Sequence, residues 1–318
     1  MSIQQIDIFA PAKLNLHLRV LAPRADGFHG IESIFQSISL SDKLRVSLTD
    51  VQGSCDFACR GMDLPPDNTV TRAVRYFREE TGFTAGVRVD LEKRIPSGAG
   101  LGGGSSDAAS VLIALDSLAG TGLSQASLAE IGSRVGSDVP FFIYGGTAVV
   151  TGRGELISPI RCRTDLFGVL IWPGVHSSTP EGYRLVDEWS SAGRADLSSV
   201  PPLSELPSRY AGSPESWGFL NSFTAPLEER YPVIREAREL LLSAGAAVAD
   251  MSGSGSSVCT GFLTTPGRLA MHGRRPPAVS KKAFNFFCLR PAECSSTMVN
   301  GYFPAPGAST AKELKVWT

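Results

Sequence analysis

The sequence lacks both a long apolar segment and a strong net charge. No run approaches the roughly 18 to 20 apolar residues that span a bilayer, and residues 1–7 have neither the basic start nor the apolar middle of a signal peptide. The 30 Lys and Arg against 31 Asp and Glu leave a net charge of −1, which supplies no field to attract nucleic acid or a membrane. We therefore expect a cytoplasmic protein with no nucleic acid and no membrane among its partners.

Paired cysteines and clustered histidines are missing too. The six cysteines are scattered over 318 residues without C-x-x-C spacing, and the four histidines do not gather near them. Reduced thiols are therefore expected, and a structural zinc site is not. With 42% hydrophobic and 19% charged residues, the chain has enough apolar material for a substantial core and for two domains.

The most informative segment that is present covers residues 96–107, Pro-Ser-Gly-Ala-Gly-Leu-Gly-Gly-Gly-Ser-Ser-Asp. Its glycines permit positive φ and a close approach to the main chain, so successive N–H groups can converge on an anion. A half-buried strand is predicted before it, over Val87–Lys93, and a helix after it, over Asp107–Leu118. This junction predicts a site for the phosphates of a nucleotide, because the donor end of the helix faces the anion.

Two common phosphate-binding motifs do not fit this segment. No Gly-Lys-Ser or Gly-Lys-Thr follows the glycines, as a Walker A element requires. The segment also does not open a G-x-G-x-x-G nucleotide-binding unit with an acidic residue about 20 residues further on. A glycine-rich turn that merely connects two elements is the alternative without function.

A predicted strand over Lys13–Leu21 carries polar groups at a spacing of two. Lys13, Asn15 and His17 therefore project to one face, while leucines take the other. A lysine and an amide on one strand face can hold a substrate hydroxyl and its catalytic acid. A polar face turned to solvent is the alternative.

Three more clusters carry groups that suit a phosphotransferase. A predicted turn presents Phe28 and His29 side by side, as stacking and edge hydrogen bonds to a planar ring require. Asp138 lies in a turn ahead of a predicted strand, Phe141–Val150, and can accept the proton of an attacking hydroxyl. A second small-residue loop, residues 251–257, indicates a ligand held between two domains. Taken singly, each could instead be a hairpin turn, a turn-forming acid or a linker.

The rest of the pattern predicts alternating helices and strands. Further helices are expected over Asn68–Glu80, Ser124–Val135 and Tyr231–Ala244. Further strands are expected over Ile3–Phe9, Ile31–Leu40, Lys43–Thr49, Gly168–Trp172, Ala247–Met251, Val258–Phe262 and Ala283–Leu289, and residues 190–216 look irregular. A change near residues 173–174 indicates a second unit that starts around residue 160.

Three motifs in order resemble those of the GHMP kinases, the superfamily of galactokinase, homoserine kinase, mevalonate kinase and phosphomevalonate kinase. Residues 96–107 resemble the central phosphate loop, residues 11–15 (Pro-Ala-Lys-Leu-Asn) the first motif, and residues 252–257 the third. The resemblance implies a two-domain α+β fold. An ATP-binding domain like domain 2 of ribosomal protein S5 would cover residues 1–160, and a ferredoxin-like α+β substrate domain would cover residues 161–318.

Within the superfamily, the segments around Lys13, Phe28, Asp138 and Gly152–Glu155 are similar to the branch that phosphorylates a cytidine diphosphate conjugate of methylerythritol in the non-mevalonate isoprenoid pathway. The resemblance implies ATP and Mg²⁺ as cofactors and Lys13 with Asp138 as the catalytic pair. The implied ATP-binding residues are Pro96, Ser97, Gly98, Ala99, Gly100, Leu101, Gly102, Gly103, Gly104, Ser105 and Ser106. It leaves the metal ligands unassigned.

The same resemblance implies which residues bind the acceptor. They are Asn15, Phe28, His29, Thr179 and Tyr183, with Phe28 standing where the family usually has tyrosine. A monomer or weak homodimer is expected. Another GHMP kinase, acting on mevalonate, homoserine or a sugar, and a non-catalytic sensor of ATP and a metabolite are the alternatives.

Overall fold

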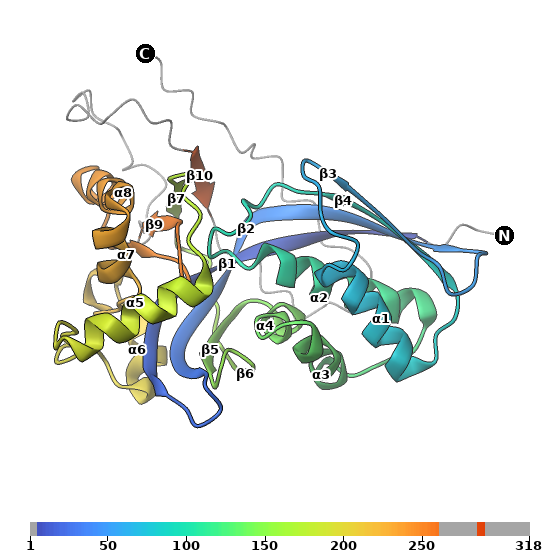
Figure 1. Cartoon of the computed structure of the whole chain (residues 1–318), viewed down its shortest axis with the longest axis horizontal. Helices are drawn as coiled ribbons and strands as arrows, with labels where there is room; N and C mark the ends of the chain where they lie inside the picture. The colour runs from blue at the N-terminus through green and yellow to red at the C-terminus, as the bar shows by residue number, and fades with distance from the viewer. Residues whose placement is uncertain (1–4, 261–284, 290–318) are drawn as a thin grey trace, which may run out of the picture.

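Two β-sheets, each with helices packed against it, organise the chain (Figure 1). The computed structural model describes residues 5–260 and 285–289. Among these residues the larger sheet has six strands in the order β3-β4-β2-β5-β6, with β1 paired to β2, and the smaller has four in the order β10-β7-β9-β8. Of the described strand pairs only β3 and β4 run parallel, and the others are antiparallel.

The elements of the described residues have the following bounds. The larger sheet contains β1 (Gln5–Pro23), β2 (His29–Thr49), β3 (Cys55–Arg60), β4 (Gly86–Glu92), β5 (Thr147–Thr151) and β6 (Leu156–Ile160). The smaller sheet contains β7 (Gly168–Trp172), β8 (Ala249–Met251), β9 (Val258–Thr260) and β10 (Asn285–Leu289). The helices are α1 (Thr69–Thr81), α2 (Gly103–Ala119), α3 (Gln125–Val135), α4 (Val139–Tyr144), α5 (Thr179–Ser191), α6 (Leu206–Ala211), α7 (Thr224–Arg230) and α8 (Pro232–Ser243), with short 3-10 turns η1 (Leu203–Glu205) and η2 (Pro214–Ser216).

The first two strands are longer than the sequence suggests. Each joins two predicted strands into one, and the register shifts where β1 passes from Pro11 to Ala12. A bulge at this point lets the strand continue through a proline, which has no N–H to donate to the ladder. The resulting hairpin continues beyond the larger sheet, passes beside α5 and α6 and turns at the lower edge of the view (Figure 1).

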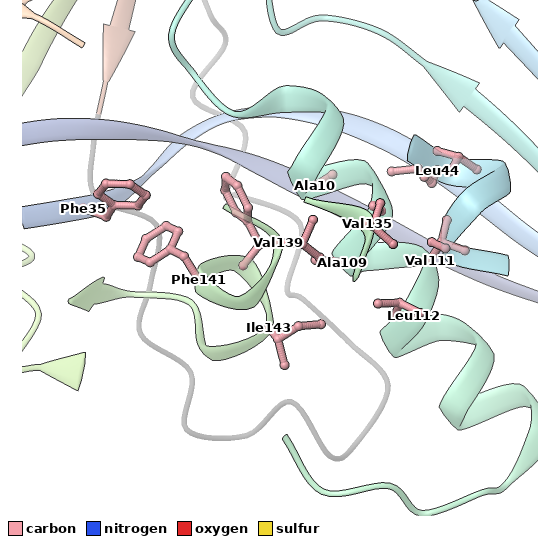
Figure 2. Close-up of a cluster of buried hydrophobic side chains, with 14 of the residues drawn as sticks. Ala10, Phe35, Leu44, Ala109, Val111, Leu112, Val135, Val139, Phe141 and Ile143 are labelled. Carbon is pink, nitrogen blue, oxygen red and sulfur yellow. The ribbon is translucent and has the colours of Figure 1, made fainter. Parts of the chain in front are cut away.

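Helices α1 to α4 cover one face of the larger sheet and enclose its core (Figures 1 and 2). Helix α2 is apolar from Ala108 to Leu115 except at Ser110, and it is buried on nearly all sides from Ser106 to Leu115. A helix that is apolar all round is stable only inside a core. The core contacts of Ala109, Val111 and Leu112 therefore fix the direction in which the N-terminus of α2 points.

The strand predicted over Phe141–Val150 is wrong in its first half. Residues 139–144 form α4, which ends at Gly145, and only Thr147–Thr151 is a strand. Pro140 in the first turn pre-sets a helical φ, and a short apolar run does not distinguish a buried helix from a strand. Asp138 consequently occupies the N-cap position of a helix.

Other expectations of the sequence differ in detail. Helix α2 begins at Gly103, earlier than Asp107, and residues 179–191 form a helix that the pattern did not predict. The segment 190–216, expected to be irregular, includes α6 and both 3-10 turns. The expected strands over residues 258–262 and 283–289 lie partly outside the described residues. Residues 264–282 and the segment after residue 289 lie wholly outside them.

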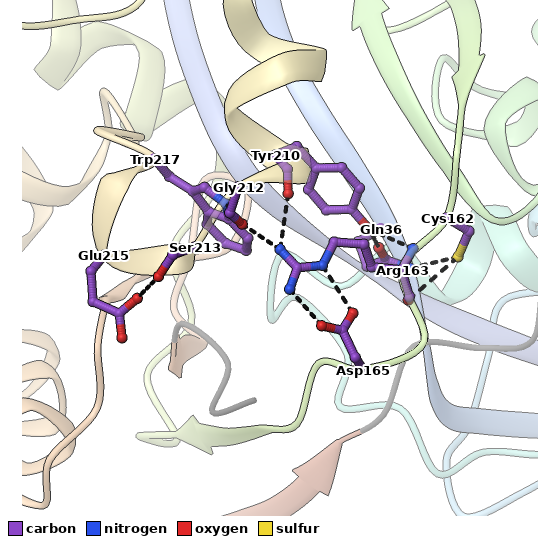
Figure 3. Close-up of polar contacts among 9 residues, drawn as sticks. All are labelled: Gln36, Cys162, Arg163, Asp165, Tyr210, Gly212, Ser213, Glu215 and Trp217. Carbon is purple, nitrogen blue, oxygen red and sulfur yellow. Dashed lines mark hydrogen bonds and ion pairs between the residues drawn. The ribbon is translucent and has the colours of Figure 1, made fainter. Parts of the chain in front are cut away.

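A buried polar network anchors α6 against β2 (Figure 3). The hydroxyl of Tyr210 donates to Oε1 of Gln36 at 2.7 Å and accepts from the backbone N–H of Arg163 at 3.1 Å. The guanidinium of Arg163 also donates to the carbonyl of Tyr210 at 3.1 Å. Because buried polar groups are stable only when paired, this network holds the segment after β6 in one place.

Candidate active site

The motifs found in the sequence meet around Gly100. We call residues 96–106 the phosphate loop and residues 252–257 the serine loop. The hydroxyl of Ser252 donates to the carbonyl of Gly100 at 3.0 Å and accepts from the backbone N–H of Asn15 at 3.1 Å. Ser257 N donates to the carbonyl of Ala99 at 3.3 Å. The structure therefore joins the β1 strand, the phosphate loop and the serine loop through direct hydrogen bonds.

The carbonyls of the phosphate loop point toward these neighbours. Those of Ala99 and Gly100 face the serine loop, and that of Leu101 accepts from Lys13 N at 3.0 Å. In a trans peptide the N–H points opposite to the C=O. The following amides, of Gly100, Leu101 and Gly102, are therefore directed to the other side of the loop, where they can bind an anion.

The side chains of the phosphate loop limit how a nucleotide can touch it. Ala99 and Leu101 are buried in a hydrophobic cluster, so only their main chain can contact a ligand. The loop leads through Gly102, with φ +69°, into the first turn of α2, where the positive end of the helix dipole lies. The hydroxyl of Ser106 in that turn is buried and has no hydrogen-bond partner among the described residues.

Lys13 lies between the phosphate loop and α4. Its Nζ is 3.7 Å from Oδ2 of Asp138, donates to Oδ1 of Asn15 and lies 4.5 Å from the ring centre of Phe35. Burial lowers the pKa of Lys13, and the charge of Asp138 acts in the opposite direction. A Cβ on Gly102 would lie 3.1 Å from Cγ of Lys13, so this glycine leaves room for the lysine to reach the acid.

Asp138 occupies the N-cap position of α4, but its carboxylate does not cap the helix. It makes no side-chain capping bond to α4, and its side chain is 31% exposed. Burial raises the pKa of Tyr183, and the charge of Asp138 raises it further. Asp138 is therefore close enough to α5 to affect the aromatic residue that the sequence placed at the acceptor site.

The expected acceptor residues fall into two groups. His29 stacks on Tyr183 with ring centres 5.0 Å apart and an angle of 19°. Phe28 is 55% exposed, and the guanidinium of Arg153 lies 5.0 Å from its ring centre. Thr179 instead contacts the serine loop, through a 3.0 Å hydrogen bond between its hydroxyl and that of Ser254.

Lys13, Asn15 and His17 do not share one face as predicted, because the register shifts between Asn15 and His17 and turns His17 to the other face. All three are buried, with exposures of 4%, 3% and 0%. Burial lowers the pKa of His17 to about 4, and its Nδ1 accepts from Leu220 N at 3.3 Å. Its ring therefore helps to dock β1 against the segment that precedes α7.

Two supporting clusters were not found from the sequence. The side-chain amide of Asn221 donates to the carbonyls of Met251 at 2.9 Å and Gly253 at 2.8 Å, which holds the serine loop. Below the phosphate loop, Lys93 donates to Asp42 and to Asp107, the latter at 2.9 Å. Neither cluster has a local sequence signature, because its members come together only through tertiary contacts.

One buried acid of the second cluster, Asp107, has a strongly shifted pKa. Burial raises the pKa of Asp107 to about 7, with Lys93 opposing the shift and Asp42 adding to it. Burial lowers the pKa of Lys93, but the charges of Asp107 and Asp42 outweigh it and the net direction is upward. This charged cluster packs beneath Gly103, where a Cβ would lie 3.1 Å from Nζ of Lys93.

Comparison with known proteins finds two family matches in this chain. The GHMP kinases N terminal domain matches residues 68–146, and the GHMP kinases C terminal domain matches residues 210–266. Among curated relatives, the 4-diphosphocytidyl-2-C-methyl-D-erythritol kinase of Treponema pallidum (strain Nichols) is 45% identical over 260 residues, covering 80% of this chain and 89% of the relative. The enzyme of the same name from Geobacter sp. (strain M21) is 37% identical over 259 residues, with the same coverage.

Solved structures agree with these family and sequence matches. The crystal structure of a 4-(cytidine 5'-diphospho)-2C-methyl-D-erythritol kinase matches with a TM-score of 0.67 and 33% identity, over 80% of this chain and 90% of that one. A homoserine kinase from Cytophaga hutchinsonii, at 19% identity and a TM-score of 0.60 over 83% of this chain and 87% of its own, shares the fold. The two-part α+β fold expected from the sequence motifs is confirmed.

Proposed function

The chain belongs to the GHMP kinase family, among its 4-diphosphocytidyl-2-C-methyl-D-erythritol kinases, and we propose that it transfers the γ-phosphoryl group of ATP to the 2-hydroxyl of 4-(cytidine 5'-diphospho)-2-C-methyl-D-erythritol. This reaction belongs to the non-mevalonate route to isoprenoid precursors. One observation carries the proposal. The Lys13–Asp138 pair lies beside a phosphate loop that is locked to the serine loop through Ser252.

We assign the ATP phosphates to the phosphate loop, residues 96–106. The outward direction of the amides of Gly100, Leu101 and Gly102 and the N-terminus of α2 support this assignment, because both favour anions. Transfer of a phosphoryl group is catalysed mainly by placement and electrostatics, so a rigid main-chain cradle suits the task.

Mg²⁺ fits this arrangement with one protein ligand. The buried and unpaired hydroxyl of Ser106 is an oxygen donor of the kind that Mg²⁺ prefers. Among the described residues no group of three His, Cys, Asp or Glu side chains could hold a metal, so phosphate oxygens would supply most of the coordination. When bound, the ion would neutralise charge between the β and γ phosphates.

Asp138 and Lys13 are the proposed catalytic pair. As the acceptor oxygen bonds to the γ phosphorus, the bond from phosphorus to the β-γ bridging oxygen breaks and ADP leaves. The hydroxyl proton passes to the carboxylate of Asp138, which is within reach of solvent and of the acceptor. The ammonium of Lys13, 3.7 Å away, faces the carboxylate of Asp138 and stabilises negative charge on the transferring group.

The acceptor is assigned to the region between α5 and the β1–β2 hairpin. The exposed ring of Phe28 offers a stacking surface for cytosine, and His29 and Tyr183 lie side by side at the same end of the hairpin. We place Thr179 at the diphosphate end, because its hydroxyl contacts the serine loop. Asn15 touches the catalytic Lys13 directly and orients it.

No helix of the described residues is long and apolar enough to cross a membrane. The net charge of −1 supports a small molecule, rather than nucleic acid or a membrane, as the partner. We propose a cytoplasmic monomer or weak homodimer, with the ATP-binding domain over residues 1–160 and the substrate domain over residues 161–318.

An assay of ADP release tests the proposed function. ATP, Mg²⁺ and the cytidine diphosphate conjugate should give turnover, whereas mevalonate, homoserine and a sugar should not. Turnover with one of these instead would assign another GHMP kinase activity. ATP binding without turnover of any acceptor would indicate a sensor, and the Asp138→Asn variant supplies the inactive reference.

A further inference from the structure

The two faces of the Phe28 ring are in different surroundings. The side chain is 55% exposed and belongs to neither hydrophobic cluster of the described residues. The guanidinium of Arg153 lies over the ring, with Cζ 5.0 Å from the ring centre. A cation at this distance is attracted to the electron-rich face of an aromatic ring, and a planar guanidinium also stacks on it. One face of Phe28 is therefore covered by a cation, and the exposure of the side chain leaves ring surface available for stacking.

Hydrogen bonds fix the main chain of Phe28 and leave its ring to other contacts. The N–H of Phe28 donates to Oδ1 of Asp26 at 3.1 Å, and its carbonyl accepts from Arg24 N at 2.8 Å. These bonds set the position of Cα, but they do not restrain rotation about the side-chain bonds. In the part of the chain that the structure describes, the contact found for the ring itself is with the guanidinium of Arg153.

Arg153 lies in the turn between β5 and β6, and that turn is held on two sides. The carbonyl of Gly152 accepts from Ile31 N at 2.8 Å, which joins the turn to β2. At Gly154, an added Cβ would lie 3.4 Å from Oδ1 of Asp138. The turn therefore contacts the β1–β2 hairpin on one side and the proposed catalytic carboxylate on the other.

Glu155 contacts the main chain of Arg153 more closely than its guanidinium. Oε2 of Glu155 accepts from Arg153 N at 2.6 Å, whereas Oε1 lies 4.0 Å from Nε. The carboxylate thus stabilises the turn, and the guanidinium stays over the aromatic ring.

We propose that Arg153 is a positioning residue for acceptor binding, whose guanidinium holds one face of Phe28 so that the other face stacks on the pyrimidine base. The inference rests on the proposed function, in which Phe28 supplies a stacking surface for cytosine. A ring that is already ordered loses less side-chain entropy when the base binds. Arg153 thereby favours binding of the base without contacting the phosphates or the reacting atoms.

The effect belongs to binding rather than to the chemical step. An exposed cation–π contact and the ordering of one side chain are both small, so loss of the guanidinium should raise the KM for the acceptor by about threefold to tenfold. Stacking acts in the ground state and the transition state alike, so kcat should not change. A variant that merely distorted the turn would instead lower kcat, because Gly154 of the same turn packs against Asp138.

Cytidine is the first probe, because it carries the base and no phosphate. As a competitive inhibitor against the acceptor, it should bind Arg153→Ala about threefold to tenfold more weakly than the wild type. Arg88→Ala is the matched control, because it removes an exposed arginine that lies on β4 of the same sheet and pairs with Asp90. It should leave the inhibition constant of cytidine and the KM values of both substrates unchanged.

A double-mutant cycle tests whether Arg153 acts through the ring. Phe28→Ala should raise the KM for the acceptor, and Arg153→Ala should then add nothing, because the ring that it holds is gone. If the two losses multiply in the double variant, or if Arg153→Ala raises the KM for the acceptor without weakening cytidine, the guanidinium binds the diphosphate and the proposal is wrong. A fall in kcat at an unchanged KM for the acceptor would also overturn it.

The outcomes separate this inference from the function on which it rests. A wild-type enzyme that is inactive on the cytidine diphosphate conjugate would overturn both. An active wild-type enzyme whose acceptor KM and cytidine affinity are unchanged in Arg153→Ala would overturn the inference alone.

A second measurement needs no acceptor. In the free protein the side-chain N–H protons of Arg153 lie over an aromatic face, so the ring current should shift their NMR signals to higher field. Phe28→Leu should remove that shift, whereas Arg88→Ala should leave it in place. Ordinary chemical shifts for these protons in the wild type would overturn the proposal whatever the kinetics show.

Discussion

Gly100 and Ser252 are packed so closely that a Cβ on Gly100 would lie 2.0 Å from the carbonyl oxygen of Ser252. Gly100 also has φ +76°, in the left-handed region. This contact joins the phosphate loop to the serine loop, since the hydroxyl of Ser252 also donates to the carbonyl of Gly100. A side chain at position 100 would have to separate the two loops.

Gly100→Ala should therefore lower the free energy of unfolding by more than backbone strain alone would, and it should weaken ATP binding. Gly53 is the matched control, because it has φ +73° and a Cβ added there would meet nothing within 4 Å. Gly53→Ala should lower the free energy of unfolding by about 1 to 2 kcal/mol and leave ATP affinity unchanged. Urea unfolding and calorimetric ATP titration measure both effects. Equal losses of unfolding free energy and of ATP affinity in the two variants would show that the contact with Ser252 is unimportant.

Asp138→Asn should lower turnover by about a hundredfold or more, because an amide cannot accept the hydroxyl proton. ATP binding should change little, since the phosphate loop is held by Asn15, Ser252 and the core. Steady-state kinetics and ATP titration of the variant check this. Asp67→Asn, at an exposed acid near α1, should behave as wild type. Near-normal turnover of Asp138→Asn would remove this residue from the mechanism.

Features that depend on local backbone chemistry could be predicted from the sequence. Ser124 caps α3, with its hydroxyl accepting from Ser127 N at 3.0 Å, as its position before an amphipathic run predicts. Gly82 ends α1 with φ +69°. The phosphate loop could be predicted for the same reason, because the path of its main chain requires glycines.

Features that depend on tertiary contacts could not be predicted. The apolar run that forms α4 fits a strand or a buried helix equally well, so the element that follows the turn at Asp138 was predicted as a strand and is a helix. Lys93 and Asp42 are 51 residues apart, and nothing in either segment indicates their pairing. The contact of His29 with α5 could not be predicted for a related reason, since α5 itself was not predicted and the helix is what brings Asp187 to within 3.3 Å of the imidazole.

His29→Ala should chiefly weaken use of the cytidine acceptor. Removal of the ring takes away both the edge hydrogen bond and the packing against Tyr183, which act in the ground state and the transition state alike. The KM for the acceptor should rise by about tenfold or more while the KM for ATP stays constant. Initial rates over a matrix of both substrates give the two constants. A rise confined to the ATP constant would contradict the cytosine assignment.

Asn221→Ala should damage both stability and catalysis. The variant leaves the carbonyls of Met251 and Gly253 without the amide that they share, at a cost of about 1 to 3 kcal/mol in the free energy of unfolding. The serine loop then loses its fixed position beside Gly100, so turnover should fall as well. Asn68→Ala is the control, because it removes the N-cap of α1 and should cost about 1 kcal/mol without lowering turnover. Equal turnover in the two variants would separate Asn221 from the site.

The cluster beneath the phosphate loop should make stability depend on pH. Burial raises the pKa of Asp107 from 3.8 to about 7, so the folded protein favours the protonated acid. The associated stability is complete below about pH 4, the ordinary range of a free aspartic acid, and is lost as the pH rises through the folded pKa. The raised pKa of Lys93 acts only in the alkaline range, outside this window.

Asp107→Asn removes the ionisation and keeps the shape of the side chain. Relative to the wild type, the variant should gain stability between pH 5 and pH 8, by an amount on the order of 1 to 4 kcal/mol. Urea unfolding at several pH values measures the difference, and Asp56→Asn, on the exposed edge strand β3, should show a constant offset. Because Lys93 keeps Asp42 as a partner in the variant, the fold around the phosphate loop should persist. A difference that does not change with pH would mean that Asp107 is already ionised in the folded protein at pH 5, held in that state by Lys93.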